Sequence, residues 1–416
     1  MSDPGPSPAP EQPPAEPGTL AARLAVKQRA GGIVVPIVTL ILAFVMAGIV
    51  VAATLGSVHK ALLTFKAIFE GAGLNWILHP TTNLVSSIAA YNLSQTLLAT
   101  STLILTGLAV AFAFRCGMFN IGGQGQYFVG LMVANWVGVS FVGLAPLPHV
   151  LFALVAGTLA GAAWAGIAGV LKATAGANEV ISTIMLNWIA IYTAIWAFEQ
   201  GGPLQNTTQP SVPISGQVVP GARLPDFWGV QGFQGVHIGL FIALGCLVLF
   251  WAILNRTTLG YEVRAVGFNP EAAAYGGINV KKNLIVAMAI SGAFAGLAGT
   301  LDMLGGTNNY QFGSLDVPFS QVGFIGIAVA LLGRNTAIGT LIGALLFGSL
   351  LYGTSQGLGS SSVINPELAG NLTYIIEGLV VLFVGADVLV LYVWNAPRRM
   401  LRRRSKAGTT TAELPA

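Results

Sequence analysis

The chain has 416 residues, of which 54% are hydrophobic and only 8% are charged, and its mean hydropathy is +0.74. A soluble globular domain carries about 25% charged residues, so this composition excludes an ordinary soluble fold and requires lipid as the solvent for most of the surface. Glycine contributes 53 residues, and membrane helices use small residues to approach one another closely.

The two ends of the chain differ from this apolar composition. Residues 1–20 are rich in Pro, Ala, Glu and Gly and have no apolar period, which is typical of a disordered tail. Basic residues cluster after residue 396. We therefore expect a Pro-rich cytoplasmic tail over residues 1–30, a transmembrane domain over 31–395 and a basic cytoplasmic tail over 396–416.

Ten apolar segments predict an all-α polytopic membrane protein. The first, 32–54, is too long for the hydrophobic part of a signal peptide, since about 20 residues span a bilayer. Helices are required because lipid offers no hydrogen-bond partner to the backbone. The other segments are 93–114, 125–143, 149–171, 181–198, 237–254, 284–304, 317–333, 336–353 and 371–394. The pair 317–333 and 336–353 forms either two spans or a re-entrant pair.

The basic residues predict the orientation. With the N-terminus inside and ten alternating spans, all of the 19 Lys and Arg residues except Lys60, Lys66 and Arg223 fall on the cytoplasmic side, as the positive-inside rule requires. Both termini are then cytoplasmic. The net charge of +4 is better explained by a basic tail beside anionic lipid than by a nucleic-acid partner.

The loop between the sixth and seventh segments, 255–283, predicts a short capped helix. An Asn at the N-cap, Pro at the first position and Glu in the first turn favour its start, and two glycines favour its end. A helix this short is marginally stable alone, so it indicates docking in a groove of another protein; a plain connector is the alternative. Its residues are Asn269, Pro270, Glu271, Ala272, Ala273, Ala274, Tyr275, Gly276 and Gly277.

Two further cytoplasmic helix starts accompany this motif. A second short helix is expected over 260–266, just before the capped one. Another helix should begin at Asn178, a good N-cap that is followed by the acidic Glu179.

Four strings carry a resemblance to a known family: FNIGGQGQ (119–126), ANEVISTIMLN (177–187), RAVGFNPEAAAYGGI (264–278) and GFIGIAVALLGRN (323–335). They resemble permease subunits of bacterial ABC importers, in the nucleoside and simple-sugar branch of the branched-chain amino acid and sugar permease family. The resemblance covers roughly residues 30–395. It implies a multi-pass protein of the bacterial cytoplasmic membrane that moves nucleosides or simple sugars, with branched-chain amino acids as an alternative substrate.

The resemblance also implies partners. The capped helix would dock on a separate cytoplasmic ABC ATPase, a second permease subunit would complete the pathway, and an extracytoplasmic lipoprotein would bind the substrate. The chain itself would not be an enzyme, since it has no Gly-x-x-x-x-Gly-Lys-Ser/Thr loop. No cofactor, metal or nucleic acid is expected, because the four His residues are dispersed and lack metal-ligand spacing.

Candidates for the substrate pathway are polar residues within or beside the apolar segments. Amides among glycines at the start of a span suit a neutral polar substrate, and broken helices line transporter sites; a cap and turn is the alternative for that stretch. For Asp302, near the outer end of its span, a packing role is favoured. The pathway candidates are Asn120, Gln124, Gln126, Asn187 and Glu377.

Three other functions compete with an ATP-driven importer. An ion-coupled secondary transporter of a small polar solute would need ionisable or carbonyl ion sites inside the spans, where charges are scarce. A channel would need a filter-like segment, and a membrane enzyme would need a nucleophile–base or metal constellation. Neither is visible in the sequence.

Overall fold

The computed structural model describes residues 34–80, 87–227, 235–306, 309–359 and the single positions 375, 378, 379 and 382. The chain divides into two compact units. The first comprises Met1–Ile41 and Asp387–Ala416, of which only the start of one helix is described. The second, Leu42–Ala386, holds the elements discussed below.

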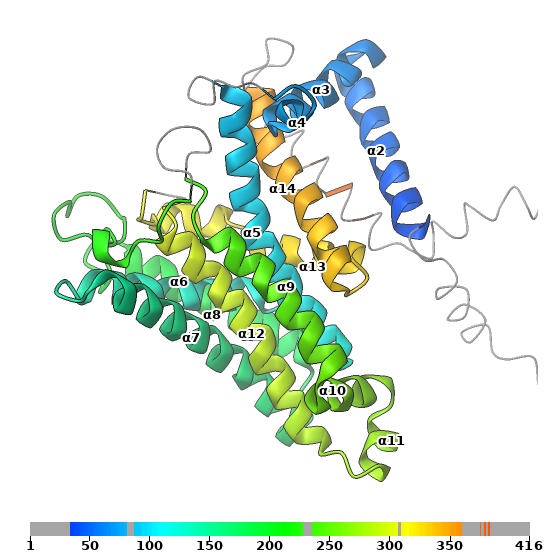
Figure 1. Ribbon diagram of the computed structural model, residues 1–416, viewed down its shortest axis with the longest axis vertical. Coiled ribbons are helices and arrows are strands. Elements are labelled where there is room, and N and C mark those ends of the chain that lie inside the picture. Colours follow the sequence, from blue (N-terminus) through cyan, green and yellow to red (C-terminus); the bar gives the residue numbers. More distant parts are fainter. Residues whose placement is uncertain are drawn as a thin grey trace, which may run out of the picture. The chain divides into compact units, whose positions relative to one another are not determined.

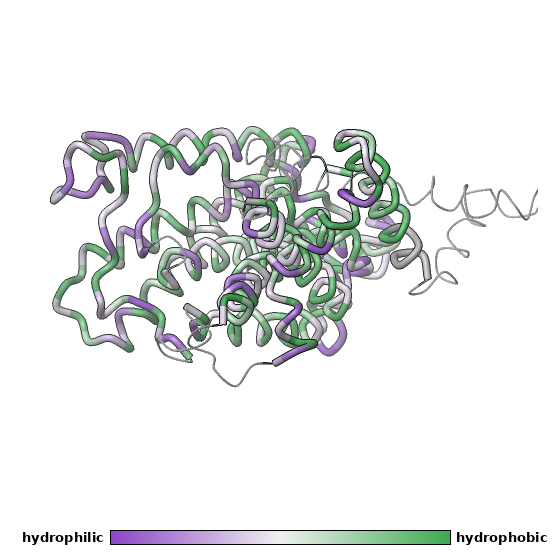
Figure 2. The backbone as a smooth tube through the Cα atoms, turned by 90° about the horizontal axis from the view of Figure 1, so that it is seen from above, coloured by the Kyte–Doolittle hydropathy of each residue, from purple (hydrophilic) through white to green (hydrophobic). Residues whose placement is uncertain are grey.

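All regular elements in the described ranges are helices (Figure 1). In chain order they are α2 (Val34–Leu55), α3 (Val58–Gly71), α4 (Leu74–Leu78), α5 (Ile88–Arg115), α6 (Gly123–Ser140), α7 (Pro146–Ala175), α8 (Glu179–Phe198), η1 (Pro220–Ala222), α9 (Gly239–Arg256), α10 (Thr258–Phe268), α11 (Pro270–Tyr275), α12 (Val280–Leu304), η2 (Ser314–Phe319), α13 (Val322–Leu332) and α14 (Ala337–Gly359). Hydrophobic residues predominate along the helices, while hydrophilic residues gather in the connections (Figure 2).

Seven described segments are long and apolar enough to cross a membrane: 88–115, 146–175, 179–198, 239–256, 280–304, 314–332 and 337–358. An all-α, multi-pass protein is thereby confirmed. The predicted segment 125–143 is the helix α6, whose polar first turn lowers its hydropathy. Residues 40–55 form a shorter apolar helix, and 371–394 lies almost entirely outside the described residues. Ten spans and cytoplasmic termini stay predictions.

The segments 317–333 and 336–353 form a helical hairpin against α5. The helix α13 has only 11 residues, or about 16 Å of helix, against about 30 Å for a bilayer core, so the segment 314–332 reaches a spanning length only together with η2. Arg334 and Asn335 both adopt positive φ angles, 51° and 53°, which turn the chain directly into α14. Both helices of the hairpin pack on α5.

Glycine brings α7 and α12 into close contact. Gly157 and Gly161 on α7 face Gly292 and Gly296 on α12, so each helix presents two glycines four residues apart. A Cβ at Gly161 would lie 2.5 Å from the carbonyl oxygen of Gly292, and a Cβ at Gly296 would lie 2.8 Å from that of Gly157. Such spacing is the common device for helix association in lipid, where close packing replaces the hydrophobic effect.

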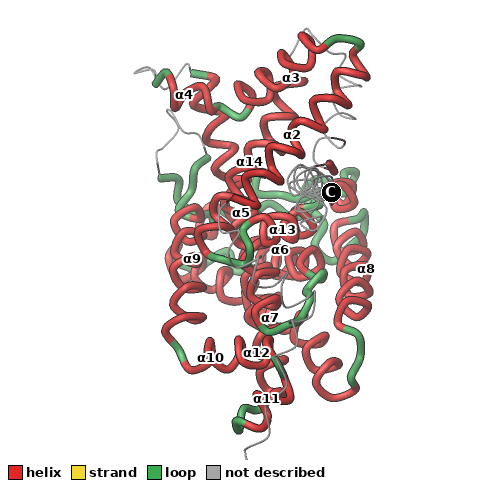
Figure 3. The backbone as a smooth tube through the Cα atoms, turned by 90° about the vertical axis from the view of Figure 1, so that its right-hand side faces the viewer, coloured by secondary structure: helices red, strands yellow, loops and turns green. Residues whose placement is uncertain are grey.

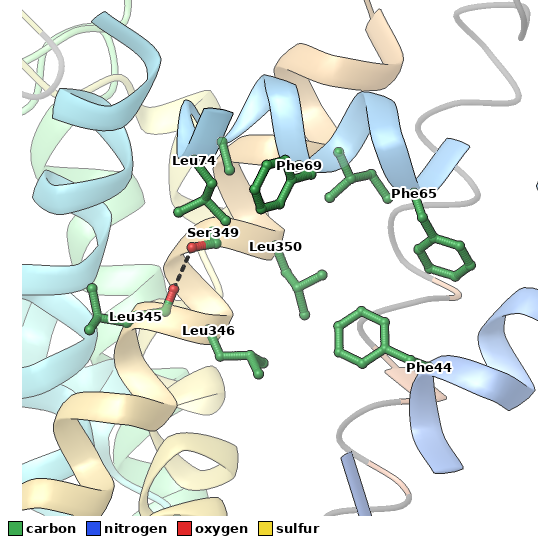
Figure 4. A pocket seen from close by; sticks show the side chains of 10 residues that line it. Phe44, Phe65, Phe69, Leu74, Leu345, Leu346, Ser349 and Leu350 are labelled. Atoms are coloured by element: carbon green, nitrogen blue, oxygen red, sulfur yellow. Dashed lines mark hydrogen bonds between the residues drawn. The ribbon is translucent and has the colours of Figure 1, made fainter. Parts of the chain in front are cut away.

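An apolar pocket of about 470 Å³ lies among α2, α3, α4 and α14. Figure 4 shows its side chains, among them Phe44, Phe69 and Leu350, and the Ser349 hydroxyl, which donates to the carbonyl of Leu345 at 2.7 Å. Phe44 and Phe65 meet edge to face, with ring centroids 6.0 Å apart. Because no charged residue is among its lining residues, this pocket offers little to a polar solute.

The connection between α8 and α9 packs over the segment that follows α12. Backbone N–H groups of Ser215 and Leu224 donate to the carbonyls of Phe312 and Leu304, each at 2.9 Å. His237 ends this connection and is 1% exposed. Its Nδ1 accepts from the N–H of Gly239 at 3.1 Å, and burial lowers its pKa to about 4. The imidazole is therefore neutral at physiological pH.

Gly161→Leu should destabilise the protein, because the new side chain has to separate two helix backbones. We expect the detergent-extracted variant to lose about 2 kcal/mol or more of its free energy of unfolding and to melt at a lower temperature. Gly166→Leu is the matched control on the same helix, since nothing lies within 4 Å of a Cβ built there. Equal melting temperatures for the two variants would contradict the close approach of α7 and α12.

Acidification should destabilise the wild type more than His237→Gln. Between pH 6.5 and about 4 the unfolded chain binds a proton at His237 that the folded chain does not, so the free energy of unfolding falls as the pH falls, by at most about 3 kcal/mol. Melting temperatures measured across this range should drop less steeply in His237→Gln. The exposed His59 provides the control variant His59→Gln, and a slope in His237→Gln as steep as in this control would refute the assignment.

Candidate functional site

The helix α6 begins inside the helix bundle. The helix α5 ends at Arg115, and residues 116–122, which connect it to α6, have no regular secondary structure. The Nδ2 of Asn120 then donates to the hydroxyl of Ser291, at 2.7 Å, and Ser291 lies in the middle of α12. Irregular backbone at such a depth is tolerated only where protein satisfies its polar groups.

Asn120 and Gln126 satisfy part of that requirement. The Oδ1 of Asn120 accepts from the N–H of Gly122 at 2.8 Å and from the Nε2 of Gln126 at 3.0 Å. Its Nδ2 also donates to the Oε1 of Gln126 at 2.9 Å. Both side chains are at most 1% exposed. Of the cap and turn considered for this stretch, the turn is therefore present and buried, whereas the N-cap of α6 is Gly122 and makes no side-chain cap hydrogen bond.

Asn187 and Gln124 link the same turn to two other helices. On α8, Asn187 accepts from the N–H of Gly125 at 2.7 Å and donates to the carbonyl of Ile121 at 2.8 Å. Gln124 donates to the carbonyl of Ser320 at 2.9 Å and accepts from the N–H of Gly323, at the start of α13, at 2.7 Å. All four amides thus bind internal partners. Their contact with substrate stays a prediction, and Glu377 lies outside the described residues.

Asp302 has a polar setting that its neighbours in the sequence do not indicate. Its Oδ1 accepts from the hydroxyl of Thr102 at 2.5 Å, and its Oδ2 accepts from the hydroxyl of Tyr127 at 2.8 Å. These contacts join α12 to α5 and α6 beside a cavity of about 270 Å³. Partners more than a hundred positions away from Asp302 give no local signal, which is why a packing role was favoured for it.

The helices α10 and α11 form a protruding pair at one end of the second unit, opposite α3 and α4 (Figures 1 and 3). The expected cap is confirmed, because the Oδ1 of Asn269 accepts from the N–H of Ala272 at 3.0 Å. Pro270 is the first helical residue, and Gly277 leaves the helix with φ 83°. The short helix expected over 260–266 is present as α10 (Thr258–Phe268).

The exposed side of this pair carries three aromatic side chains. Tyr275 is 94% exposed, Phe268 79% and Tyr261 64%, whereas Ala273 is only 6% exposed and faces inward. Glu271 and Ala272 are also exposed. We refer to Tyr261, Phe268, Glu271, Ala272 and Tyr275 as the α10–α11 face. Large exposed aromatic side chains are the usual anchors of protein–protein interfaces.

The α10–α11 pair is fastened to the transmembrane helices at two points. The Oε2 of Glu262 on α10 accepts from the Nδ2 of Asn283 on α12 at 2.8 Å. A Cβ at Gly267 would collide with the carbonyl of Arg115, at the end of α5. Arg115 in turn donates through Nε and Nη2 to the carbonyl of Asn335, at 3.0 and 2.7 Å. The helix α10 thus contacts α12 and the end of α5 directly, and Arg115 links that end of α5 to the α13–α14 turn.

The helix α8 starts as predicted. The Oδ1 of Asn178 accepts from the N–H groups of Val180 and Ile181 at 2.9 and 3.4 Å. Glu179 lies 2.8 Å from the Nζ of Lys172, which holds the start of α8 against the end of α7.

Comparison with known proteins gives a consistent result. Residues 92–385 match the family described as branched-chain amino acid transport system, permease component. The chain is 38% identical over 305 residues to the guanosine ABC transporter permease protein NupP of Bacillus subtilis, in an alignment that covers 73% of this chain and 83% of that protein.

Two further relatives extend the comparison. The nucleoside ABC transporter permease protein NupB of Lactococcus lactis is 34% identical, covering 73% of this chain and 81% of that protein. The glucose ABC transporter permease protein TsgB13 of Haloferax volcanii is 33% identical, covering 71% and 76%. No solved structure matches.

Proposed function

The chain belongs to the permease-component family of the branched-chain amino acid transport systems, and we propose that it forms part of the membrane pathway of an ATP-driven nucleoside importer. Membership makes it a membrane-spanning transport subunit and assigns ATP hydrolysis to another polypeptide. Family membership also argues against the three alternative functions considered from the sequence: an ion-coupled transporter, a channel and a membrane enzyme. The observation that carries the nucleoside proposal is the extensive identity with the guanosine permease.

Simple sugars are the second substrate class. The glucose permease among the relatives favours them, but two relatives named for guanosine and nucleosides are more similar to this chain. Branched-chain amino acids, which the family description names, rank third. Nucleosides and sugars are both neutral and rich in hydroxyl groups, so one type of pathway suits both.

We propose that the α10–α11 face docks on the cytoplasmic ABC ATPase. The exposed Phe268 and Tyr275 support this, since a short helix with unburied aromatic residues gains stability from a partner's groove. The contacts of α10 with α5 and α12 supply the connection through which closure of the ATPase would move the spans as rigid bodies. Asn269, Pro270, Gly276 and Gly277 shape the helix, and Ala273 packs it inward.

The remaining partners and the topology complete the proposal. A second permease subunit would share the pathway, and an extracytoplasmic lipoprotein would deliver the substrate. The protein would lie in a bacterial cytoplasmic membrane with about ten spans, with residues 1–30 and 396–416 as cytoplasmic tails. The mid-helix Trp188 on α8, 53% exposed, supports a protein neighbour there, because Trp in membranes concentrates at the interfaces.

Nucleoside uptake should depend on this chain. We expect a strain that lacks its gene to lose most high-affinity uptake of radiolabelled guanosine, and a plasmid copy to restore it. Unlabelled nucleosides should compete with the label, while glucose and leucine should not. Competition by glucose and not by nucleosides would move the assignment to sugars, and normal guanosine uptake in the deletion strain would contradict the proposal.

Tyr275→Ala and Phe268→Ala should release the ATPase. Loss of an aromatic interface anchor costs about 2 kcal/mol or more, equivalent to about 30-fold in affinity. Less ATPase should therefore copurify with the tagged chain, and uptake should fall at unchanged membrane abundance. Leu62→Ala, an exposed residue on α3 (63%), is the control at the opposite end. ATPase retention equal to that control would place the docking surface elsewhere.

A further inference from the structure

Within the described ranges, a carboxylate without a cationic partner lies at the end of α12. Two ion pairs are present in those ranges, Lys66–Glu70 and Lys172–Glu179, and neither involves Asp302. Its contacts there are the hydroxyl groups of Thr102 and Tyr127. A charge within a helix bundle is costly, and such residues usually serve a substrate or ion path. If the side chain served packing alone, an amide at this position would make similar hydrogen bonds at a lower desolvation free energy.

The cavity beside Asp302 is lined partly by polar and partly by apolar residues. Its residues are Tyr127, Asp302, Met303, Gln311, Phe312, Asp316, Ser320 and Val322. Polar residues come from α6, α12, η2 and the loop residues on either side of η2, while Met303, Phe312 and Val322 supply an apolar wall. Its volume of about 270 Å³ is near the lower end of ligand pockets, about 300 Å³. An apolar wall with a few converging polar groups is the usual form of a small-molecule site.

The charges of the lining select a class of ligand. Two acidic residues, Asp302 and Asp316, are among the lining residues, and none of the lining residues is Lys or Arg. A phosphate or a free carboxylate would meet only negative charge there, which excludes nucleotides and disfavours amino acids. A carboxylate has about four acceptor sites, and the hydroxyls of Thr102 and Tyr127 occupy two at Asp302. The remaining sites suit a molecule that has adjacent hydrogen-bond donors and no negative charge, and a neutral nucleoside meets both conditions.

We propose that this cavity is a substrate subsite of the permease, in which Asp302 accepts hydrogen bonds from adjacent O–H or N–H donors of a neutral nucleoside. The inference rests on the proposed function and adds to it a site and a reason for selectivity. Thr102 and Tyr127 orient the carboxylate, and Phe312 and Val322 contact the apolar face of the ligand. The donors are either the ribose 2′- and 3′-hydroxyls or the N–H groups of the base.

Substrate protection of an introduced cysteine tests occupancy of the cavity. Ser320→Cys places a thiol in its wall, while the native Cys116 and Cys246 are 2% and 8% exposed and provide a low background. In membranes that contain the complete transporter, a small cationic methanethiosulfonate should label the introduced thiol, and guanosine should slow the labelling while GMP and leucine should not. Absence of labelling above the native background, or labelling that guanosine leaves unchanged, would overturn the proposal.

Uptake kinetics test Asp302 itself. Asp302→Asn should raise the KM for guanosine about tenfold or more, the loss expected for hydrogen bonds to a charged group, and the exposed Glu199→Gln should not. Competition then identifies the donors: 2′,3′-dideoxyguanosine should lose potency if the ribose is bound, and inosine should lose potency if the base is bound. An unchanged KM in Asp302→Asn would refute the subsite while leaving the importer intact, whereas absent wild-type uptake would refute the importer itself.

Discussion

Close contact between helix backbones is the constraint on which the rest of this structure depends. Lipid gives transmembrane helices no hydrophobic reason to associate, so association requires backbones that touch. Glycines on α7 and α12 provide that contact, and Gly130 on α6 meets the backbone of α12 at Gly296 in the same way. The irregular segment before α6 and the first turn of α6 are held by polar partners on α12 and on two helices outside this glycine contact, α8 and α13.

The buried amide side chains connect the start of α6 to the neighbouring helices. Asn120, Gln124 and Asn187 bind the polar groups of the irregular segment and of the first turn of α6, and they link this region to α12, α13 and α8. At the C-terminal end of α5, just before the irregular segment, Arg115 donates to the carbonyl of Asn335 in the α13–α14 turn. The α10–α11 pair rests on α5 and α12 and presents exposed aromatic residues outward. The same helices, α5 and α12, also carry Thr102 and Asp302 beside the cavity, so the α10–α11 face and the cavity share two helices.

Local features of this arrangement could be predicted from the sequence, and contacts between distant residues could not. The caps at Asn269 and Asn178 were predictable, since a cap depends on residues two or three positions away. The apolar segments could be predicted from hydropathy because each is one continuous run of the sequence. The depth at which α6 begins, the inward direction of Ala273 and the hydroxyl partners of Asp302 are set by helices far away in the chain. The exposure of Phe268 had a weak sequence signal, because an aromatic residue lies there directly before the N-cap.

The central claim is that ATP hydrolysis by a separate subunit drives a neutral nucleoside through this chain. Transport by the purified complex in proteoliposomes tests it most directly, with ATP supplied on the ATPase side and with ionophores that abolish H⁺ and Na⁺ gradients. The account predicts guanosine transport that requires hydrolysable ATP and is unaffected by the ionophores. Transport that continues with a non-hydrolysable ATP analogue and stops when the ion gradients collapse would contradict it.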